Sequence, residues 1–373
     1  MKSELLERIK KSSKVEAEYL SDKVAVDKPI THTKIPGFNL IMSGKYDGGF
    51  YGGLTTIAAP SRHFKSSILV MMMHEWLEQN SDGVAVFYDS ENGASKDMFE
   101  SYGIDMDRII SKEIMNIEDL KFDIMDLLEN QISKEDNIFI GIDSIGNLAS
   151  KKEVEDALKE NSATDMTRAK QLKSLFRMVT PYLGKYAIPM VAINHVYSEI
   201  GLFPKTIMGG GQGPLLASDS VIFLSKATDK DGKEISGFQF TLSTHKSRYT
   251  REGMKLPLKV SFENGIDRTS GLLELGLFTG GLDKKGHRYA PVIIDEETGE
   301  VTIDEDMLRY KKDINISWFD DIATNPKYCF KQKLEDYAAL AKTKMISEDE
   351  EEDETDAVLE SLEEEMQEFN SDA

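Results

Sequence analysis

Short apolar runs alternate with amphipathic segments along the first half of the chain. The runs are rich in β-branched residues, have the length of buried strands and lie at residues 54–58, 84–88, 138–142 and 189–194. Helical spacing of apolar residues predicts helices between them, at about residues 66–78, 114–132 and 165–183. Strands that alternate with helices form a mostly parallel sheet covered by helices on both faces. We therefore predict an α/β core that binds its ligands beyond the carboxyl ends of its strands.

The alternation stops in the second half of the chain. Apolar runs predict three antiparallel strands added to the sheet, at residues 219–224, 237–244 and 255–262. A small α+β unit is expected next, with a helix, a hairpin and further helices at residues 272–277, about 297–299 and up to about 345. The sequence thus predicts an N-terminal helical arm that docks on a neighbouring subunit, a core, a C-terminal α+β domain and a disordered acidic tail, at residues 1–30, 31–270, 271–345 and 346–373.

Composition excludes several classes of protein. The single cysteine, Cys329, rules out an internal disulfide framework and a cysteine-based zinc cluster. Aliphatic stretches of at most about seven residues are far shorter than the roughly 20 residues of a membrane span. The first residues lack the apolar segment of a secretion signal. We expect a cytoplasmic protein with no membrane contact, in the host cytoplasm if a phage encodes it.

The net charge of −21 is unevenly distributed. Residues 347–373 hold fourteen acids and no lysine or arginine, so that removing these fourteen charges leaves −7 for the first 346 residues. A nucleic-acid site on such a mildly acidic body must be a local basic patch. The tail is either a solubilising disordered end or a mimic of phosphate charge that competes with DNA for that patch.

A candidate phosphate loop lies between the first core strand and the helix that follows it. It consists of Ala59, Pro60, Ser61, Arg62, His63, Phe64, Lys65, Ser66 and Ser67. The standard pattern is G-x-x-x-x-G-K-[ST]. Here Lys65 and Ser66 are intact, but Ala59 and Phe64 replace both glycines. The alternative is a polar turn with Ser66 as the helix cap. In the phosphate-loop interpretation, backbone N–H groups cradle phosphates, Lys65 reaches the β- and γ-phosphates and Ser66 binds Mg²⁺.

Acidic residues end two further predicted strands. Asp143 follows the apolar run 138–142, where a carboxylate can hold Mg²⁺ through water, and Asp89 to Glu91 follow the run 84–88. A carboxylate at Glu91 can orient the water that attacks the γ-phosphate. Ordinary strand-end acids and a helix cap are the alternatives for each residue. The candidate phosphate loop, Asp143 and Glu91 would all lie at one edge of the sheet, and together they favour a nucleotide site.

Read together, these segments resemble the RecA family of recombinases over about residues 30–345. The phosphate loop with Phe before Lys resembles that of the phage-type members. The resemblance implies a RecA-like ATPase core, ATP and Mg²⁺ as cofactors, and Glu91 as the catalytic acid. It places His195, after Asn194, where the family senses the γ-phosphate. It places Lys246 and Arg248 where two cations reach the neighbouring subunit's ATP, and it places the adenine-stacking ring near Met98, which has none.

DNA binding rests partly on the resemblance and partly on the residues. Residues 143–153 resemble the start of the family's first DNA loop, and Met208 to Pro214 resemble the end of its second. Residues 196–214 contain five glycines and no clear periodicity. On the helix predicted at 165–183, three cations face away from the apolar side, and a fourth lies on it. The expected DNA-binding residues are Lys170, Lys173, Arg177, Arg168, Gly209, Gly210, Gly211 and Gln212.

The sequence therefore predicts an ATP-dependent strand-exchange recombinase that serves recombination, replication and repair. It would form head-to-tail helical filaments on single-stranded DNA and pair that strand with homologous duplex. Single-strand-binding and loader proteins are the expected helpers. One alternative is a ring-shaped helicase with the same core. Another is a DNA-coating protein that does not hydrolyse ATP, which the intact Lys65, Ser66, Asp143 and Glu91 disfavour.

Overall fold

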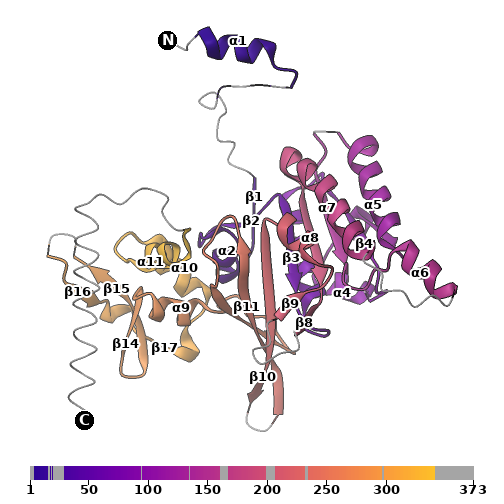
Figure 1. The fold of residues 1–373 in the computed structure, drawn as a ribbon. Helices are drawn as coiled ribbons and strands as arrows, with labels where there is room; N and C mark the ends of the chain where they lie inside the picture. The colour runs from indigo at the N-terminus through magenta and orange to yellow at the C-terminus, as the bar shows by residue number, and fades with distance from the viewer. Residues whose placement is uncertain are drawn as a thin grey trace, which may run out of the picture. The chain divides into compact units, whose positions relative to one another are not determined.

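A computed structural model describes the chain at residues 4–15, 17, 19, 29–93, 95–133, 135–159, 167–198, 206–231, 234–295 and 298–340. A nine-stranded sheet, in the order β13-β12-β11-β10-β3-β7-β6-β4-β5, forms its centre (Figure 1). Its strands are β3 (Gly53–Ala58), β4 (Val84–Asp89), β5 (Ile109–Glu113), β6 (Ile138–Asp143), β7 (Pro189–Asn194), β10 (Ser220–Asp231), β11 (Glu234–Ser247), β12 (Lys255–Ser261) and β13 (Gly265–Ile266). All neighbouring pairs from β10 to β5 are parallel, and those from β10 to β13 are antiparallel. The predicted α/β fold class is confirmed.

Side chains alternate across the parallel strands and supply two separate buried clusters. On β4, Ala85 and Phe87 belong to one cluster, whereas Val86 and Tyr88 belong to the other. Each cluster has its own helices, because successive residues of a strand point to opposite faces of the sheet. The first face is covered by α2 (Pro36–Ser43), α3 (Lys65–Gln79) and α4 (Lys96–Ser101), and the second by α5 (Ile117–Asp126) and α7 (Thr167–Tyr186).

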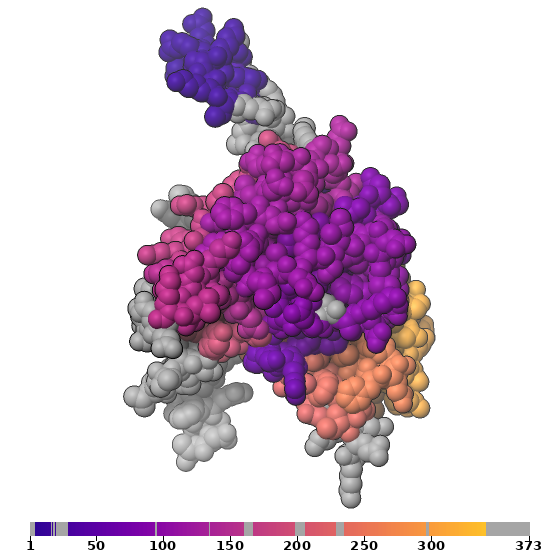
Figure 2. Space-filling view, turned by 90° about the vertical axis from the view of Figure 1, so that its right-hand side faces the viewer, coloured from indigo at the N-terminus to yellow at the C-terminus, as the bar shows by residue number. Residues whose placement is uncertain are grey.

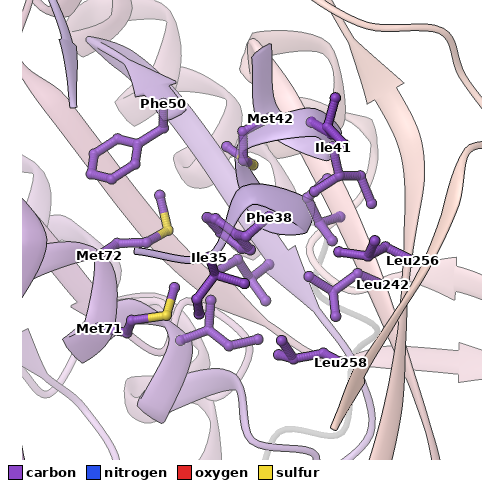
Figure 3. Packing of buried hydrophobic residues seen from close by; sticks show 14 of the residues in the cluster. Ile35, Phe38, Ile41, Met42, Phe50, Met71, Met72, Leu242, Leu256 and Leu258 are labelled. Atoms are coloured by element: carbon purple, nitrogen blue, oxygen red, sulfur yellow. The ribbon is translucent and has the colours of Figure 1, made fainter. Parts of the chain in front are cut away.

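Helix α2 packs with β11, β12 and α3 in the first cluster. Figure 3 shows Phe38 and Met42 of α2 between Leu242 and Leu256 of the two strands and the methionine side chains of α3. Phe38 is only 1% exposed. Pro36 begins the helix, where its missing N–H costs nothing, and Gly44 ends it in the left-handed conformation. The apolar sequence of α2 is explained by burial on all sides.

The remaining elements lie before and after this core. A short sheet pairs β1 (Ile30–His32) with β2 (Gly49–Tyr51), and the C-terminal part carries a four-stranded sheet. Its elements are α9 (Leu272–Phe278), β14 (Leu282–Lys285), β15 (Arg288–Ile294), β16 (Val301–Ile303), η3 (Glu305–Met307), β17 (Arg309–Tyr310), η4 (Lys311–Asp313), α10 (Ile316–Thr324) and α11 (Phe330–Ala338). Helix α11 joins the cluster of α2 through Phe330 and Leu334. In the part of the chain that is described, no helix is long and apolar enough to cross a membrane.

Several details differ from the sequence prediction. Strand β5 was not predicted, because its residues are half-buried or exposed at the sheet edge. The helix expected at 114–132 begins at Ile117 and ends in a wider π turn, η2 (Leu127–Gln131). The expected aperiodic loop 196–214 includes a hairpin of β8 (Val196–Ser198) and β9 (Thr206–Met208) and the start of α8 (Gln212–Ala217). Strands β10 and β11 are longer than predicted, and β10 is parallel to β3.

The expected arm and tail differ in how much of each is described. Helix α1 (Glu4–Ser12) matches the expected charged helix, and Leu5, Leu6 and Ile9 are all about half exposed. The expected tail, 346–373, lies outside the described residues.

Figure 2 shows a face of the core on which residues coloured purple to magenta form most of the surface.

Candidate functional site

The loop from residue 59 to residue 64 joins the carboxyl end of β3 to α3. Phe64 has φ 64° and Arg62 has φ 60°, both in the left-handed region. Phe64 therefore adopts the kind of conformation for which glycine is normally used. Ala59 needs no such freedom, since its φ is not positive, and it is fully buried. The loop thus stays tight and leads directly into a helix although both glycines are replaced, and this is the geometry that a phosphate loop requires.

Lys65 is a buried cation at the start of α3. Lys65 is only 7% exposed, and its Nζ donates a hydrogen bond to the Pro60 carbonyl at 2.8 Å. Burial lowers the pKa of Lys65, and the charges of Glu91 and Asp143 oppose that shift. Within the described part of the chain, Lys65 makes no ion pair. An anionic phosphate in the loop would supply the missing counter-charge.

Asp143 lies at the end of β6, directly opposite Asp89 of β4 in the parallel register. It is 4% exposed, and burial raises its pKa to about 6, although a hydrogen bond from Ser66 opposes the rise. Nearby Glu91 and Asp89 raise it further. Ser66 and Asp143 are oxygen ligands of the kind that Mg²⁺ prefers. The donor set therefore fits MgATP, although the described residues contain no cluster of three or more His, Cys, Asp or Glu side chains suited to a metal.

Glu91, two residues beyond β4, accepts three hydrogen bonds on one carboxylate oxygen. Its Oε1 accepts from Ser144 Oγ at 2.6 Å, Asn147 Nδ2 at 2.9 Å and His195 Nε2 at 3.0 Å. Burial alone would raise the pKa of Glu91. The hydrogen bonds from Ser144 and His195 outweigh it and hold the pKa below its usual value. Glu91 is therefore a fixed carboxylate near Lys65 and Asp143.

Asn194 and His195 connect the carboxyl edge of the sheet to the glycine segment, residues 209–213. Asn194 ends β7, is fully buried and donates from Nδ2 to the Gly209 carbonyl at 2.9 Å. The Gly209 N–H donates back to the His195 carbonyl at 2.9 Å. A Cβ on Gly146 would lie 2.4 Å from the His195 ring, so this contact requires glycine. Hydrogen bonds through two residues, His195 and Asn194, thus link the Glu91 carboxylate to Gly209.

The glycine segment packs against α7, the helix that carries Lys170, Lys173 and Arg177. A Cβ on Gly210 would meet Leu172 at 2.6 Å, and one on Gly213 would meet the Lys173 backbone at 2.8 Å. Gly211 precedes α8, and Gln212 begins it. Lys170, Lys173 and Arg177 are exposed, whereas Leu172, Leu175, Phe176 and Val179 are buried. The structure therefore packs this glycine segment against the first half of α7, with Gly213 next to Lys173.

Arg168 has different surroundings from those three cations. Its guanidinium donates to the carbonyls of Leu148, at 2.8 Å, Ile145, at 3.2 Å, and Gly146. These carbonyls belong to the segment that follows Asp143. Arg168 therefore positions that segment from within, which explains why it falls on the apolar side of the helical wheel.

Lys246 lies at the end of β11 and Arg248 directly follows the strand, and both have partners within the protomer. Lys246 Nζ donates to the carbonyls of Leu215, Leu216 and Ser218, at 3.0, 2.9 and 2.8 Å, at the carboxyl end of α8. Burial lowers its pKa, and the nearby charge of Arg248 adds to that effect. Arg248 pairs with Asp219 at 3.0 Å, but its side chain remains 60% exposed. Both cations lie away from the phosphate loop of their own subunit. Lys246 pairs with Val221 near the start of β10, and the Arg248 N–H donates to the Asp219 carbonyl just before that strand, whereas the loop follows the carboxyl end of β3.

Sequence reasoning missed Ser144, Asn147 and Phe240 as parts of this site. The two polar residues fix Glu91, and Phe240 stacks on Phe64 with ring centroids 5.2 Å apart. Their positions in the strand-end segments gave a weak signal for the first two, and nothing in the sequence pointed to Phe240. Phe99, next to Met98, packs edge-on against Phe87 and is 8% exposed, so it belongs to the core.

A parallel sheet whose edge carries a tight loop with a buried lysine, a pair of strand-end acids and a fixed glutamate is typical of nucleotide-binding α/β proteins. A family model for the RecA N-terminal domain matches residues 42–267. The recombination and repair protein of Enterobacteria phage T4 is 42% identical over 320 residues, or 85% of this chain and 81% of that protein. The RecA proteins of Bacteroides thetaiotaomicron and Paracoccus denitrificans are 24% and 20% identical, over 65% and 64% of this chain and 72% and 66% of their own lengths. The chain belongs to the RecA family.

The buried acid at Asp143 generates a prediction about stability. Because the folded-state pKa lies above the usual value, the ionised carboxylate destabilises the nucleotide-free fold above about pH 6, by about 3 kcal/mol. Asp143→Asn should therefore raise the melting temperature at pH 7.5, and the gain should shrink as the pH falls to 5. Asp97→Asn, which changes an exposed acid of α4, is the matched control. An unchanged or lower melting temperature for Asp143→Asn would contradict this electrostatic account.

Proposed function

We propose that this chain is an ATP-dependent DNA strand-exchange recombinase. ATP-bound subunits assemble head to tail on single-stranded DNA, and the filament pairs that strand with homologous duplex. The observation that carries the proposal is the chain of hydrogen bonds from Glu91 through His195 and Asn194 to Gly209, the first residue of the glycine run whose later residues, Gly210 and Gly213, pack against α7. Such a connection lets the DNA surface and the nucleotide edge respond to each other.

Each residue of the nucleotide edge has a role in this proposal. Lys65 and the loop N–H groups bind the phosphates, while Ser66 and Asp143 hold Mg²⁺. MgATP, when bound, supplies the phosphoanhydride bond whose hydrolysis weakens DNA binding and permits release. Glu91 orients the attacking water and accepts its proton. His195 is one of three donors to Glu91 Oε1, so a shift of the second loop on DNA would remove one of the hydrogen bonds that compete with water for this carboxylate.

DNA contacts in the proposal are electrostatic and local. Lys170, Lys173 and Arg177 neutralise backbone phosphates, and the glycines let the backbone approach the strand closely. Gly209 to Gly211 and Gln212 would contact DNA from the second loop, and Arg168 would shape the first loop. The helicase alternative has the same nucleotide edge, and the names of the relatives, which concern recombination and RecA, favour the recombinase. The position of Glu91 disfavours a coat that does not hydrolyse ATP.

The function is tested by strand exchange between a circular single strand and homologous linear duplex. The wild-type protein should produce exchanged product with ATP, and Lys65→Ala should produce none, because the variant loses the cation that would face the β- and γ-phosphates. Lys45→Ala, an exposed lysine in the same part of the chain, is the matched control. Exchange at the wild-type rate by Lys65→Ala would disprove the assignment of the phosphate loop.

Glu91→Gln should keep nucleotide binding and lose hydrolysis by at least about a hundredfold. The amide preserves the shape of the side chain but cannot accept a proton from water. We expect filaments that form on single-stranded DNA and disassemble slowly, measured by phosphate release and by a DNA-binding time course. Glu129→Gln, an exposed acid of η2, should hydrolyse ATP normally. Rapid turnover in Glu91→Gln would assign the catalytic role to another acid.

Lys246 and Arg248 are proposed to act on the ATP of the neighbouring subunit. Arg248→Ala should lose DNA-stimulated hydrolysis while each monomer still binds nucleotide. Mixed filaments of Arg248→Ala and Glu91→Gln should recover partial activity, because some interfaces then combine an intact Glu91 with an intact Arg248. Confirmed mixed filaments that show no recovery at any ratio would argue against action across the interface.

A further inference from the structure

The phosphate loop holds two non-glycine residues in the left-handed region, and both are contacted by the same pair of strands. We propose that Phe64 is a positioning residue: its ring, stacked on Phe240, fixes the loop in the conformation that the standard motif obtains from glycine. The proposal deepens the nucleotide site of the proposed function and rests on it. It assigns a role to the one position at which this loop departs from the pattern by a bulky side chain.

The conformation of Phe64 requires a compensating contact. A bulky L-residue is rarely found with φ near +64°, because its Cβ crowds the backbone. Such a conformation persists only where the surrounding structure determines it. Phe64 is also the residue before α3, and its carbonyl accepts the Ile68 N–H at 3.2 Å. The orientation of Phe64 therefore sets the first turn of α3, which carries Lys65 and Ser66.

The compensating contact comes from β11. The rings of Phe64 and Phe240 are stacked, with centroids 5.2 Å apart and an angle of 18° between their planes. Phe240 is 2% exposed and belongs to the main buried cluster, so its ring cannot move freely. Offset-stacked aromatic pairs attract each other beyond the area that they bury. Phe64 thus anchors a surface loop to a fixed ring of the core.

The second left-handed residue receives a contact from the neighbouring strand. Lys226 of β10 is the cross-strand partner of Phe240, and its Nζ lies 3.5 Å from the Arg62 carbonyl. The same ammonium lies 3.4 Å from the centroid of the Phe238 ring and 6.0 Å from that of the Phe240 ring. Both left-handed residues are therefore supported from one small surface of the β10–β11 ribbon.

The expected consequence is a loop that is ordered before nucleotide arrives. A glycine at residue 64 could adopt the same φ, but it would also sample many others, so the free loop would lose its fixed shape. Preorganisation affects binding more than the chemical step. Loss of the stack should therefore weaken nucleotide binding and leave the rate at saturating ATP nearly unchanged.

The test measures binding of a fluorescent ATP analogue with Mg²⁺, hydrolysis at saturating ATP on single-stranded DNA, and melting temperature. Phe64→Gly should raise the nucleotide Kd about tenfold and change kcat by less than about twofold. Phe64→Tyr, which keeps an aromatic ring at this position, should bind nucleotide with a Kd near the wild-type value. Phe240→Leu should weaken binding in the same way, and the double variant Phe64→Gly/Phe240→Leu should be no weaker than Phe64→Gly alone. Phe122→Leu, an exposed phenylalanine of α5, is the matched control.

The outcomes separate this proposal from the proposed function. If Lys65→Ala loses nucleotide while Phe64→Gly binds it as tightly as the wild type, the nucleotide site stands and the role of Phe64 is wrong. Additive losses in the double variant would also overturn it, since the two rings would then act independently. A fall of kcat and melting temperature together, with Kd unchanged, would show that Phe64 serves the fold only. If Lys65→Ala binds normally, the nucleotide site itself is wrong.

Discussion

Four parallel strands end at the same edge of the sheet, and their register decides which side chains meet there. Ala58 of β3 is level with Asn194 of β7, and Asp89 of β4 is level with Asp143 of β6. This register brings a buried lysine and two buried acids together without ion pairs between them in the described structure. Such an arrangement destabilises the empty protein, and bound MgATP would relieve it. The edge is therefore built for an anionic ligand and its cation.

In the proposed function, the same register would link distant surfaces to the nucleotide. Asn194 ends β7 and His195 follows it, so hydrogen bonds through these two residues link Glu91 to Gly209. Lys246 lies on the strand next to β10 and holds the carboxyl end of α8, the helix that follows those glycines. In the proposed filament, one lysine would thus have two sets of partners, the α8 carbonyls and the neighbouring nucleotide. Occupation of either set would bias the other, as reciprocal coupling requires.

The parallel core could be predicted from the sequence because its strands are short, apolar and regularly separated by amphipathic helices. The nucleotide edge followed from strand-end acids and from the Lys65-Ser66 pair, and the family resemblance added His195, Lys246 and Arg248. Strand β5 could not be predicted, because an edge strand needs no apolar alternation. The stack of Phe64 on Phe240 joins residues far apart in sequence, and no local pattern encodes it. Arg168 showed its role only once its carbonyl partners in the first loop were known.

In the proposed function, DNA binding and ATP hydrolysis occur in one open helical assembly. The most direct measurement combines ATP hydrolysis, with and without single-stranded DNA, with electron microscopy of the same samples. The account predicts hydrolysis that rises strongly on single-stranded DNA, together with extended helical filaments along the strand. Closed rings, or hydrolysis that does not respond to DNA, would contradict it.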